Sequence, residues 1–263
     1  MRLRKQLTYT VAALLWSGPS LALTDTEQLG KSIFFDDNLS INKNQSCAAC
    51  HAPEMGWTGP DSVINAGGAV YSGSITADDL LAPPSNENRF GNRKPPSSAY
   101  ATPSPVLHFV DEKANNENKT EALFIGGNFW DGRATGETLG NPAAEQAQGP
   151  FLNPVEQALP GPAEVISRIC GSSYVDSFTQ VCGTDACDTS DPANVSAAYD
   201  CVGLSVAAYE GSPEVNQYTS KYDAFLAGTV GLRTNRCQRS NSTVTNKAIA
   251  PPRSSRPRMA VRS

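Results

Sequence analysis

The chain has 263 residues, of which 39% are hydrophobic, and a formal charge of −5 at neutral pH. Seven Arg and one Lys but no acidic residue lie within 231–263, so the rest of the chain holds the remaining 13 of the 21 basic side chains against all 26 acidic ones. A body this acidic argues against nucleic acid as a partner and suits a basic redox partner.

The N-terminus has the pattern of an export signal. Basic residues precede an apolar run at 11–16, and Ser20 and Ala22 have the spacing of a signal-peptidase site. The apolar run is too short to cross a bilayer, and no other segment approaches that length. We therefore predict a signal peptide at 1–22 and a soluble periplasmic protein with no membrane span.

A short helix is predicted over 24–35. Thr24 can cap it together with Glu27, three residues further on. Apolar residues then recur at helical spacing, namely Leu29, Ile33 and Phe34.

Cys47-Ala48-Ala49-Cys50-His51 has the attachment signature of a c-type haem. The thiols of Cys47 and Cys50 can bond the two vinyl groups, which places His51 beneath the iron as the proximal ligand. A redox pair would need a thioredoxin-like context, and half a zinc site would need a second Cys or His pair. The sequence shows neither and has only two histidines. We predict one covalently attached haem c.

Two later regions are predicted to lack regular structure. Residues 56–105 are rich in Gly, Pro, Ser and Asn, which predicts a long loop region. A long loop beside a cofactor is usually a pocket wall or lid. Residues 111–120 are polar and predict an exposed excursion.

An aromatic and basic segment follows. Phe129 and Trp130 could pack on a porphyrin, and Arg133 could pair with a haem propionate. The alternative is a turn with two core aromatics.

The second half of the chain predicts more helices. Amphipathic patterns cover 162–169 and 193–209, and 220–226 is typical of one or two last helical turns. The hydrophobic pattern ends after Val230, so 231–263 is predicted to be disordered, with a basic interaction arm as the alternative. The folded haem domain is therefore expected at 23–230.

Four cysteines cluster in a polar stretch: Cys170, Cys182, Cys187 and Cys201. In an oxidising compartment they predict two disulfides, and three pairings are open. A metal site is the alternative, although no histidine lies nearby. Cys237 is left over.

An ordered set of segments resembles the bacterial di-haem cytochrome c peroxidases, a family that includes the methylamine-dehydrogenase maturation enzymes. The resemblance runs from about Leu29 to Leu226 and is most specific where Phe-Trp-Asp-Gly-Arg is followed by Gln-Ala-x-Gly-Pro and Val-Glu. The segments are 29–31, 34–36, 39–40, 46–51, 56–58, 92–100, 129–134, 146–150 and 153–156.

The resemblance implies an all-α, cytochrome c-like haem domain with long irregular loops. On its pattern His51 is the proximal ligand, Glu156 the distal acid/base, Gln146 a distal polar residue and Trp130 the aromatic between two haems. Splitting the O–O bond of a peroxide needs a proton shuttle near an open iron position, and a pocket carboxylate can serve. Without the resemblance, a surface role would be expected for Glu156.

Departures from the family pattern also carry expectations. No histidine follows His51 in the loop that often supplies a capping ligand, so the haem is expected to be five-coordinate. His108 is a candidate second axial ligand, and a partly buried structural histidine is the alternative. Lys94 stands where an interdomain calcium ligand is expected, which puts calcium in doubt, and Gln157 replaces a methionine.

The second haem domain of the family has no counterpart in this sequence, because no further Cys-x-x-Cys-His occurs. A slip of the reading frame near Val230 would explain the foreign composition of the tail. We expect a chain that lacks the electron-transfer haem.

The sequence therefore predicts a truncated periplasmic cytochrome c peroxidase that reduces hydrogen peroxide with electrons from a small cytochrome c or cupredoxin. A mono-haem electron carrier is the first alternative, but it would need an axial methionine. Met55 is too near His51 to reach the opposite face of the haem, and Met259 lies in the tail. A maturation-type haem oxidase and a non-catalytic remnant are the others.

Overall fold

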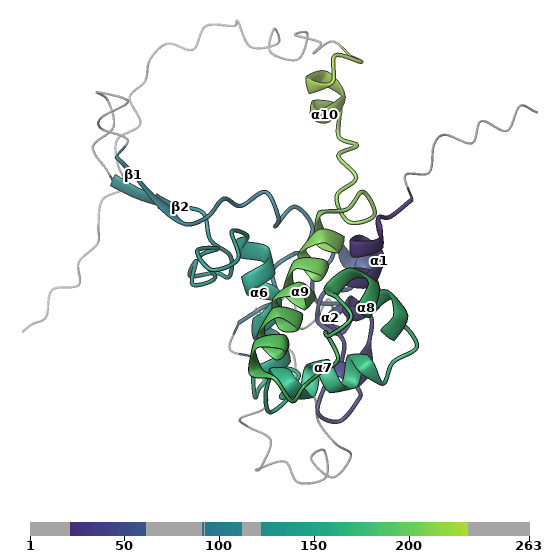
Figure 1. Ribbon diagram of the computed structural model, residues 1–263. Helices are drawn as coiled ribbons and strands as arrows, with labels where there is room; N and C mark the ends of the chain where they lie inside the picture. Colours follow the sequence, from purple (N-terminus) through teal and green to yellow (C-terminus); the bar gives the residue numbers. More distant parts are fainter. Residues whose placement is uncertain (1–21, 62–90, 92, 112–121, 231–263) are drawn as a thin grey trace, which may run out of the picture. The chain divides into compact units, whose positions relative to one another are not determined.

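The computed structural model describes residues 22–61, 91, 93–111 and 122–230 (Figure 1). Contacts divide the chain into two parts, the second of which begins at Tyr218. None of the helices in the described ranges is long and apolar enough to cross a membrane. The described helices of the first part are α1 (Asp25–Phe34), α2 (Cys47–Cys50), α6 (Pro142–Leu152), α7 (Pro162–Cys170), α8 (Val175–Cys182) and α9 (Pro192–Gly211), with 3₁₀ turns at Asp37–Leu39 and Pro53–Met55.

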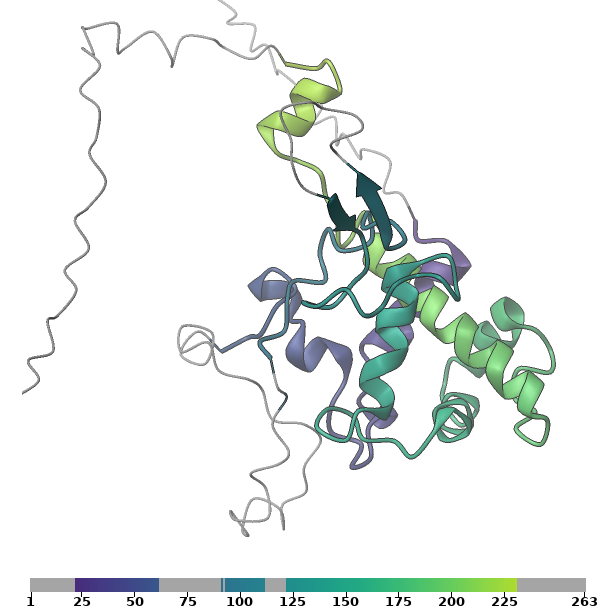
Figure 2. The ribbon, with the colours of Figure 1, turned by 90° about the vertical axis from the view of Figure 1, so that its left-hand side faces the viewer.

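Helix α9 is the central element of the first part, and α1, α6, α7 and α8 pack on it (Figures 1 and 2). Burial of their apolar faces is the main stabilising contribution. The helices predicted at 24–35, 162–169 and 193–209 are confirmed as α1, α7 and α9. The largest fully buried side chains of this core include Leu29, Ile33, Phe34, Phe151, Val165, Ile166, Ile169, Phe178, Val202 and Val206.

Helix α1 begins with the predicted capping box, in which Thr24 and Glu27 satisfy each other's backbone N–H groups. At its crossing with α9 it carries Gly30, where a Cβ would lie 1.8 Å from the carbonyl oxygen of Ser205. Only glycine allows this approach. One turn later the rings of Phe34 and Tyr209 meet edge to face at 5.6 Å, so the two helices are locked in register.

Helix α6 was not predicted. Asn141 caps it by accepting from the N–H groups of Ala143 and Ala144. Its buried face consists largely of alanine, and Pro150 lies inside its last turn. The sequence therefore shows little amphipathic contrast and contains a residue that usually breaks helices.

A two-stranded sheet is the one departure from an all-α fold among the described residues. Strand β1 (His108–Asp111) pairs antiparallel with β2 (Ala122–Ile125). Phe109 lies opposite Phe124, and their rings meet at 5.4 Å. The expectation of an exposed excursion at 111–120 falls almost wholly outside the described residues.

The last helix is α10 (Lys221–Leu226), which confirms the helical turns predicted at 220–226. Ser220 and Asp223 form a capping box at its start. The prediction for 231–263 lies outside the described residues, and so does that for 1–22 except for its last residue; both remain predictions.

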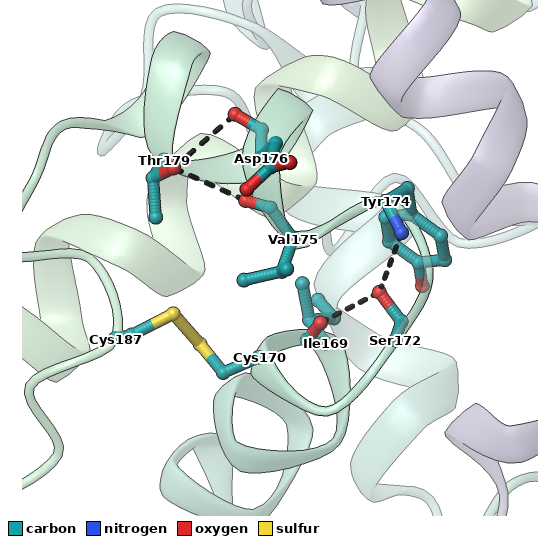
Figure 3. Close-up of a disulfide and its surroundings, with 8 residues drawn as sticks. All are labelled: Ile169, Cys170, Ser172, Tyr174, Val175, Asp176, Thr179 and Cys187. Atoms are coloured by element: carbon teal, nitrogen blue, oxygen red, sulfur yellow. Dashed lines mark hydrogen bonds between the residues drawn. A yellow bond between two sulfur atoms is a disulfide. The ribbon is translucent and has the colours of Figure 1, made fainter.

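Both predicted disulfides are present, and the structure selects one of the three pairings. Cys170 bonds to Cys187, and Cys182 bonds to Cys201. The first bond ties the end of α7 to the segment after α8, and the second ties α8 to α9. Figure 3 shows how the turn between α7 and α8 is held: the Ser172 hydroxyl donates to the Ile169 carbonyl at 2.6 Å and accepts from the Tyr174 N–H at 3.3 Å.

Replacing both members of one bond, as in Cys182→Ala/Cys201→Ala, is expected to lower the free energy of unfolding by about 3 kcal/mol. The reason is that the bond closes a loop between two cysteines 19 residues apart, and without it the unfolded chain gains conformational entropy. Urea unfolding followed by circular dichroism measures the loss. Peptide mapping without reductant checks the pairing, and a 170–182 or 182–187 cross-link in the wild type would contradict it.

Candidate functional site

A cavity of about 540 Å³ lies among α2, α6, α9 and the loops around 93–101 and 128–133. Its volume is within the range of cofactor sites. Cys47, Cys50 and His51 line it together with Gln146 and Glu156. The structure thus brings the attachment motif and both predicted distal residues to one place.

The attachment motif forms the short helix α2, with His51 as its C-cap. The N–H of His51 donates to the Cys47 carbonyl at 2.9 Å, which closes the turn. Both thiols are free. Burial raises the pKa of each, that of Cys50 to about 11, so both are neutral thiols in the cavity wall.

The His51 ring is oriented by a backbone carbonyl. Its Nδ1 lies 3.2 Å from the carbonyl oxygen of Trp57. A carbonyl accepts but does not donate, so Nδ1 carries the proton in this contact. The backbone of Pro96 also hydrogen-bonds the ring, while burial lowers the pKa of His51 and favours the neutral imidazole. A neutral imidazole protonated at Nδ1 would bind a metal through Nε2. Trp57 adopts a left-handed backbone conformation with φ of 63°, and its ring packs edge to face on Tyr209 at 5.9 Å. Packing of Trp57 in the core therefore fixes the position of its carbonyl group, and this carbonyl orients the His51 ring.

Glu156 stands on a tight turn that follows α6. Its N–H donates to the Asn153 carbonyl at 2.9 Å, and the Asn153 side chain accepts from the N–H of Val155 at 3.1 Å. The next residue, Gln157, accepts through its carbonyl from the N–H of Ile41 at 2.8 Å. This bond pins the turn to the segment before α2, so the carboxyl group cannot drift from the cavity.

Opposing influences act on the Glu156 carboxyl. Burial raises its pKa, while the Arg133 guanidinium and a hydrogen bond with Asn153 act in the opposite direction. The net result is a pKa above the ordinary glutamate value. A carboxyl tuned in this way takes up and releases a proton more readily near neutral pH.

Aromatic and basic side chains form one edge of the cavity. The Arg133 guanidinium lies 3.7 Å from the centre of the Phe129 ring and pairs with Asp131 at 2.9 Å. Arg93 pairs with the same carboxylate at 3.0 Å. Two cations thus share one anion, which leaves this edge positive and suited to a propionate. Trp130 lines the same edge, is 65% exposed and donates to the Lys94 carbonyl at 3.0 Å.

The residues present fit a c-type haem. Two free thiols and an imidazole line one cavity of suitable size. Gln157 also lines the cavity, is 3% exposed, and its side-chain oxygen has no hydrogen-bond partner in the described ranges. A buried polar atom without a partner is rare in a native protein and is consistent with a site built to receive a further group.

His108 is not retained as an axial ligand. It is the first residue of β1, is exposed, and pairs through Nδ1 with the Val106 carbonyl at 2.8 Å. It is not among the residues that line the cavity. The alternative prediction, a partly buried structural histidine, is also wrong, because His108 is exposed.

Sequence reasoning did not single out Arg93 or Glu210, which line the cavity, and noted Gln157 only as a replacement for a methionine. Arg93 lies within a segment of the resemblance that was given no chemical role, and α9 was predicted only as a packing helix. These residues come from segments that are far apart in the sequence, so only the folded structure shows that they line one cavity.

Comparisons with known proteins agree with this site. Residues 24–231 match the family described as di-haem cytochrome c peroxidase. The methylamine utilization protein MauG of Paracoccus denitrificans is 35% identical over 201 residues, which are 76% of this chain and 44% of that protein. Two crystal structures of the diheme peroxidase BthA from Burkholderia thailandensis, one of them a variant, match with TM-scores of 0.59 and 0.61 at 26% and 25% identity.

Those structural alignments cover 81% of this chain and 44% and 45% of the solved chains. The chain thus spans less than half the length of the relatives it matches. The resemblance found in the ordered motifs and the mostly helical, cytochrome c-like fold class are both confirmed. The chain belongs to the di-haem cytochrome c peroxidase family of haem-containing oxidoreductases.

Proposed function

We propose that this chain binds one haem c covalently and reduces hydrogen peroxide to water. The observation that carries the proposal is the convergence of the Cys47–His51 motif and Glu156 on one cavity. Membership of a peroxidase family supports the reaction class.

The attachment residues have distinct roles. Cys47 and Cys50 would form the two thioether bonds, and His51 would hold the iron through Nε2. When bound, the haem supplies a redox-active iron with a position open to a peroxide oxygen. The positive edge at Arg93 and Arg133 would receive the propionates and so set the orientation of the ring.

Glu156 is proposed to move the proton. Its carboxylate would take a proton from one peroxide oxygen and return it to the other, which would then leave as water. Overall, two electrons and two protons convert one peroxide to two water molecules. Gln146 lines the same cavity as Glu156, and its amide can donate a hydrogen bond that orients the peroxide.

The electrons are proposed to come from a small cytochrome c or cupredoxin with a basic face, because residues 1–230 are strongly acidic. Trp130 is exposed and borders the cavity, so it is a suitable contact on the route of the electrons. Periplasmic location follows from the predicted signal peptide.

Oxidation of a protein side chain is the second candidate function. The 35% identity to the methylamine utilization protein MauG favours it. In that case Glu156 and His51 keep their roles and another protein supplies the electrons. An electron carrier is less well supported, since Met55 is exposed and is not among the cavity residues.

The test is to express the full chain in a host that attaches c-type haem and to purify it from the periplasm. A pyridine haemochrome assay should give one haem per chain, and the ferric spectrum should be high-spin and change on addition of peroxide. A low-spin ferric haem that is inert to peroxide would reject the proposal. Peroxide turnover with reduced small cytochromes or cupredoxins then separates the peroxidase from the side-chain oxidase.

A further inference from the structure

Glu210 is a buried carboxyl group that no step above uses. It lies in the last turn of α9, is 4% exposed, and lines the same cavity as Cys47 and His51. Its side chain is hydrogen-bonded by the Ser98 side chain, which is 6% exposed. Its negative charge raises the pKa of the Cys47 thiol, which places the carboxyl close to the thioether edge of the site.

Among the described residues, no cation pairs with this carboxyl: Lys, Arg and His nitrogens form no ion pair with Glu210. Lys31 of α1 pairs instead with Glu214 at 2.6 Å, and Arg168 of α7 pairs with Glu164 at 2.8 Å. Helices α6 and α8 carry no Lys or Arg. The acidic groups on the helices packed against α9 are Asp25, Glu27, Glu145, Glu164 and Asp176.

The loops around the cavity do not change this balance. Arg93 and Arg133 are committed to Asp131, and Lys94 also lines the cavity without an ion pair to Glu210. Within the described ranges, the Ser98 side chain is the polar group that hydrogen-bonds the carboxyl, and burial has the larger effect on its pKa. Burial raises the pKa of Glu210 to about 7.

We propose that Glu210 is a positioning residue that sets the charge beside the haem. Its carboxylate takes up a proton from water when the ferric haem gains one electron and releases that proton on reoxidation. The inference rests on the haem proposed above. The physical reason is that a charge in a dry cavity acts strongly on its neighbours. A Glu210 carboxylate favours the more positive ferric state, whereas the neutral carboxyl does not, so electron uptake and proton uptake favour each other. Burial and nearby charge are recognised means of setting haem potentials.

The expected result is a midpoint potential that falls as pH rises through the neutral range. A one-electron, one-proton couple changes its equilibrium constant for reduction by up to tenfold per pH unit. Glu210→Gln has nearly the same shape and should hold the potential near the low-pH value of the wild type at every pH. Glu210→Asp should restore a pH dependence.

Ser98→Ala tests how the Ser98 hydrogen bond affects the pKa of Glu210. The Ser98 bond lowers the pKa of Glu210, so its loss should move the pH-dependent window upward without removing it. Glu214→Gln is the matched control, because Glu214 lies just beyond α9, is exposed and pairs with Lys31. Its potential should follow that of the wild type.

Spectroelectrochemical titrations with redox mediators measure these potentials. They run from pH 5.5 to 8.5, about one and a half pH units on either side of the Glu210 pKa. They are run on the full chain, with haem content recorded for each variant. Glu156→Gln is included so that the other cavity carboxyl is separated from Glu210, and the slope should persist in it. A haem-loaded Glu210→Gln protein with the wild-type slope would overturn this inference alone. Absence of covalent haem from the wild type would overturn the proposed function with it.

Discussion

Glu156→Gln is expected to slow the reaction with hydrogen peroxide about 10²- to 10⁴-fold, the contribution typical of a positioned acid or base. The substitution removes the group proposed to carry the proton between the peroxide oxygens but keeps its size and the backbone bonds of its turn. Stopped-flow absorbance at the haem band measures the rate. Haem content and the ferric spectrum should be those of the wild type.

The pH dependence of the same reaction provides an internal check. The carboxylate is the active form, and burial raises its pKa, so the rate should fall on acidification through that raised value. Arg133 favours the charged form. Arg133→Gln should therefore raise the pKa of Glu156 further and move the acid limb toward neutral pH. An acid limb that moves the other way, or a Glu156→Gln enzyme with full activity, would contradict the assignment.

Cys47→Ser/Cys50→Ser is expected to abolish covalent haem attachment. The two thioether bonds require these two thiols, which are the free cysteines of the described residues. Haem staining of a denaturing gel, or partition of haem into acidified organic solvent, measures the loss: haem should stay with the wild-type polypeptide and leave the variant completely.

The matched control for attachment is Cys170→Ser/Cys187→Ser, which also removes two cysteines but breaks a disulfide outside the cavity. This variant should keep haem on the polypeptide while losing stability. Covalent haem in the Cys47→Ser/Cys50→Ser protein would show that the attachment site has been misplaced. Single substitutions should leave one thioether, which shifts the haemochrome band.

Local signals were sufficient for several parts of this structure. The haem motif occupies five consecutive residues, and the cap of α1 depends on Thr24 and Glu27, which are three positions apart. Helices α7 and α9 follow from periodicity within single segments. In each case the determining contacts lie within one or two helical turns, so a reader of the sequence sees all of them.

Other features depend on contacts between distant segments. Four clustered cysteines allow three pairings, and only the packing of α7 and α8 beside α9 brings Cys170 to Cys187 and Cys182 to Cys201. Helix α6 buries alanines, whose fit against α9 becomes visible only when the two helices are in contact. The sheet of β1 and β2 likewise joins segments separated by a polar stretch.

The sequence by itself determined which chemical groups this protein has: two thiols and an imidazole for a haem, and, through an ordered resemblance, Glu156 and Gln146 as partners. Tertiary structure decided which groups share a cavity. It brought Glu210 beside Cys47, excluded His108 and held Glu156 in place through a bond from Ile41. The physical reason is that attachment chemistry depends on covalently adjacent residues, whereas burial, charge balance and proton transfer depend on neighbours that only the packed helices bring together.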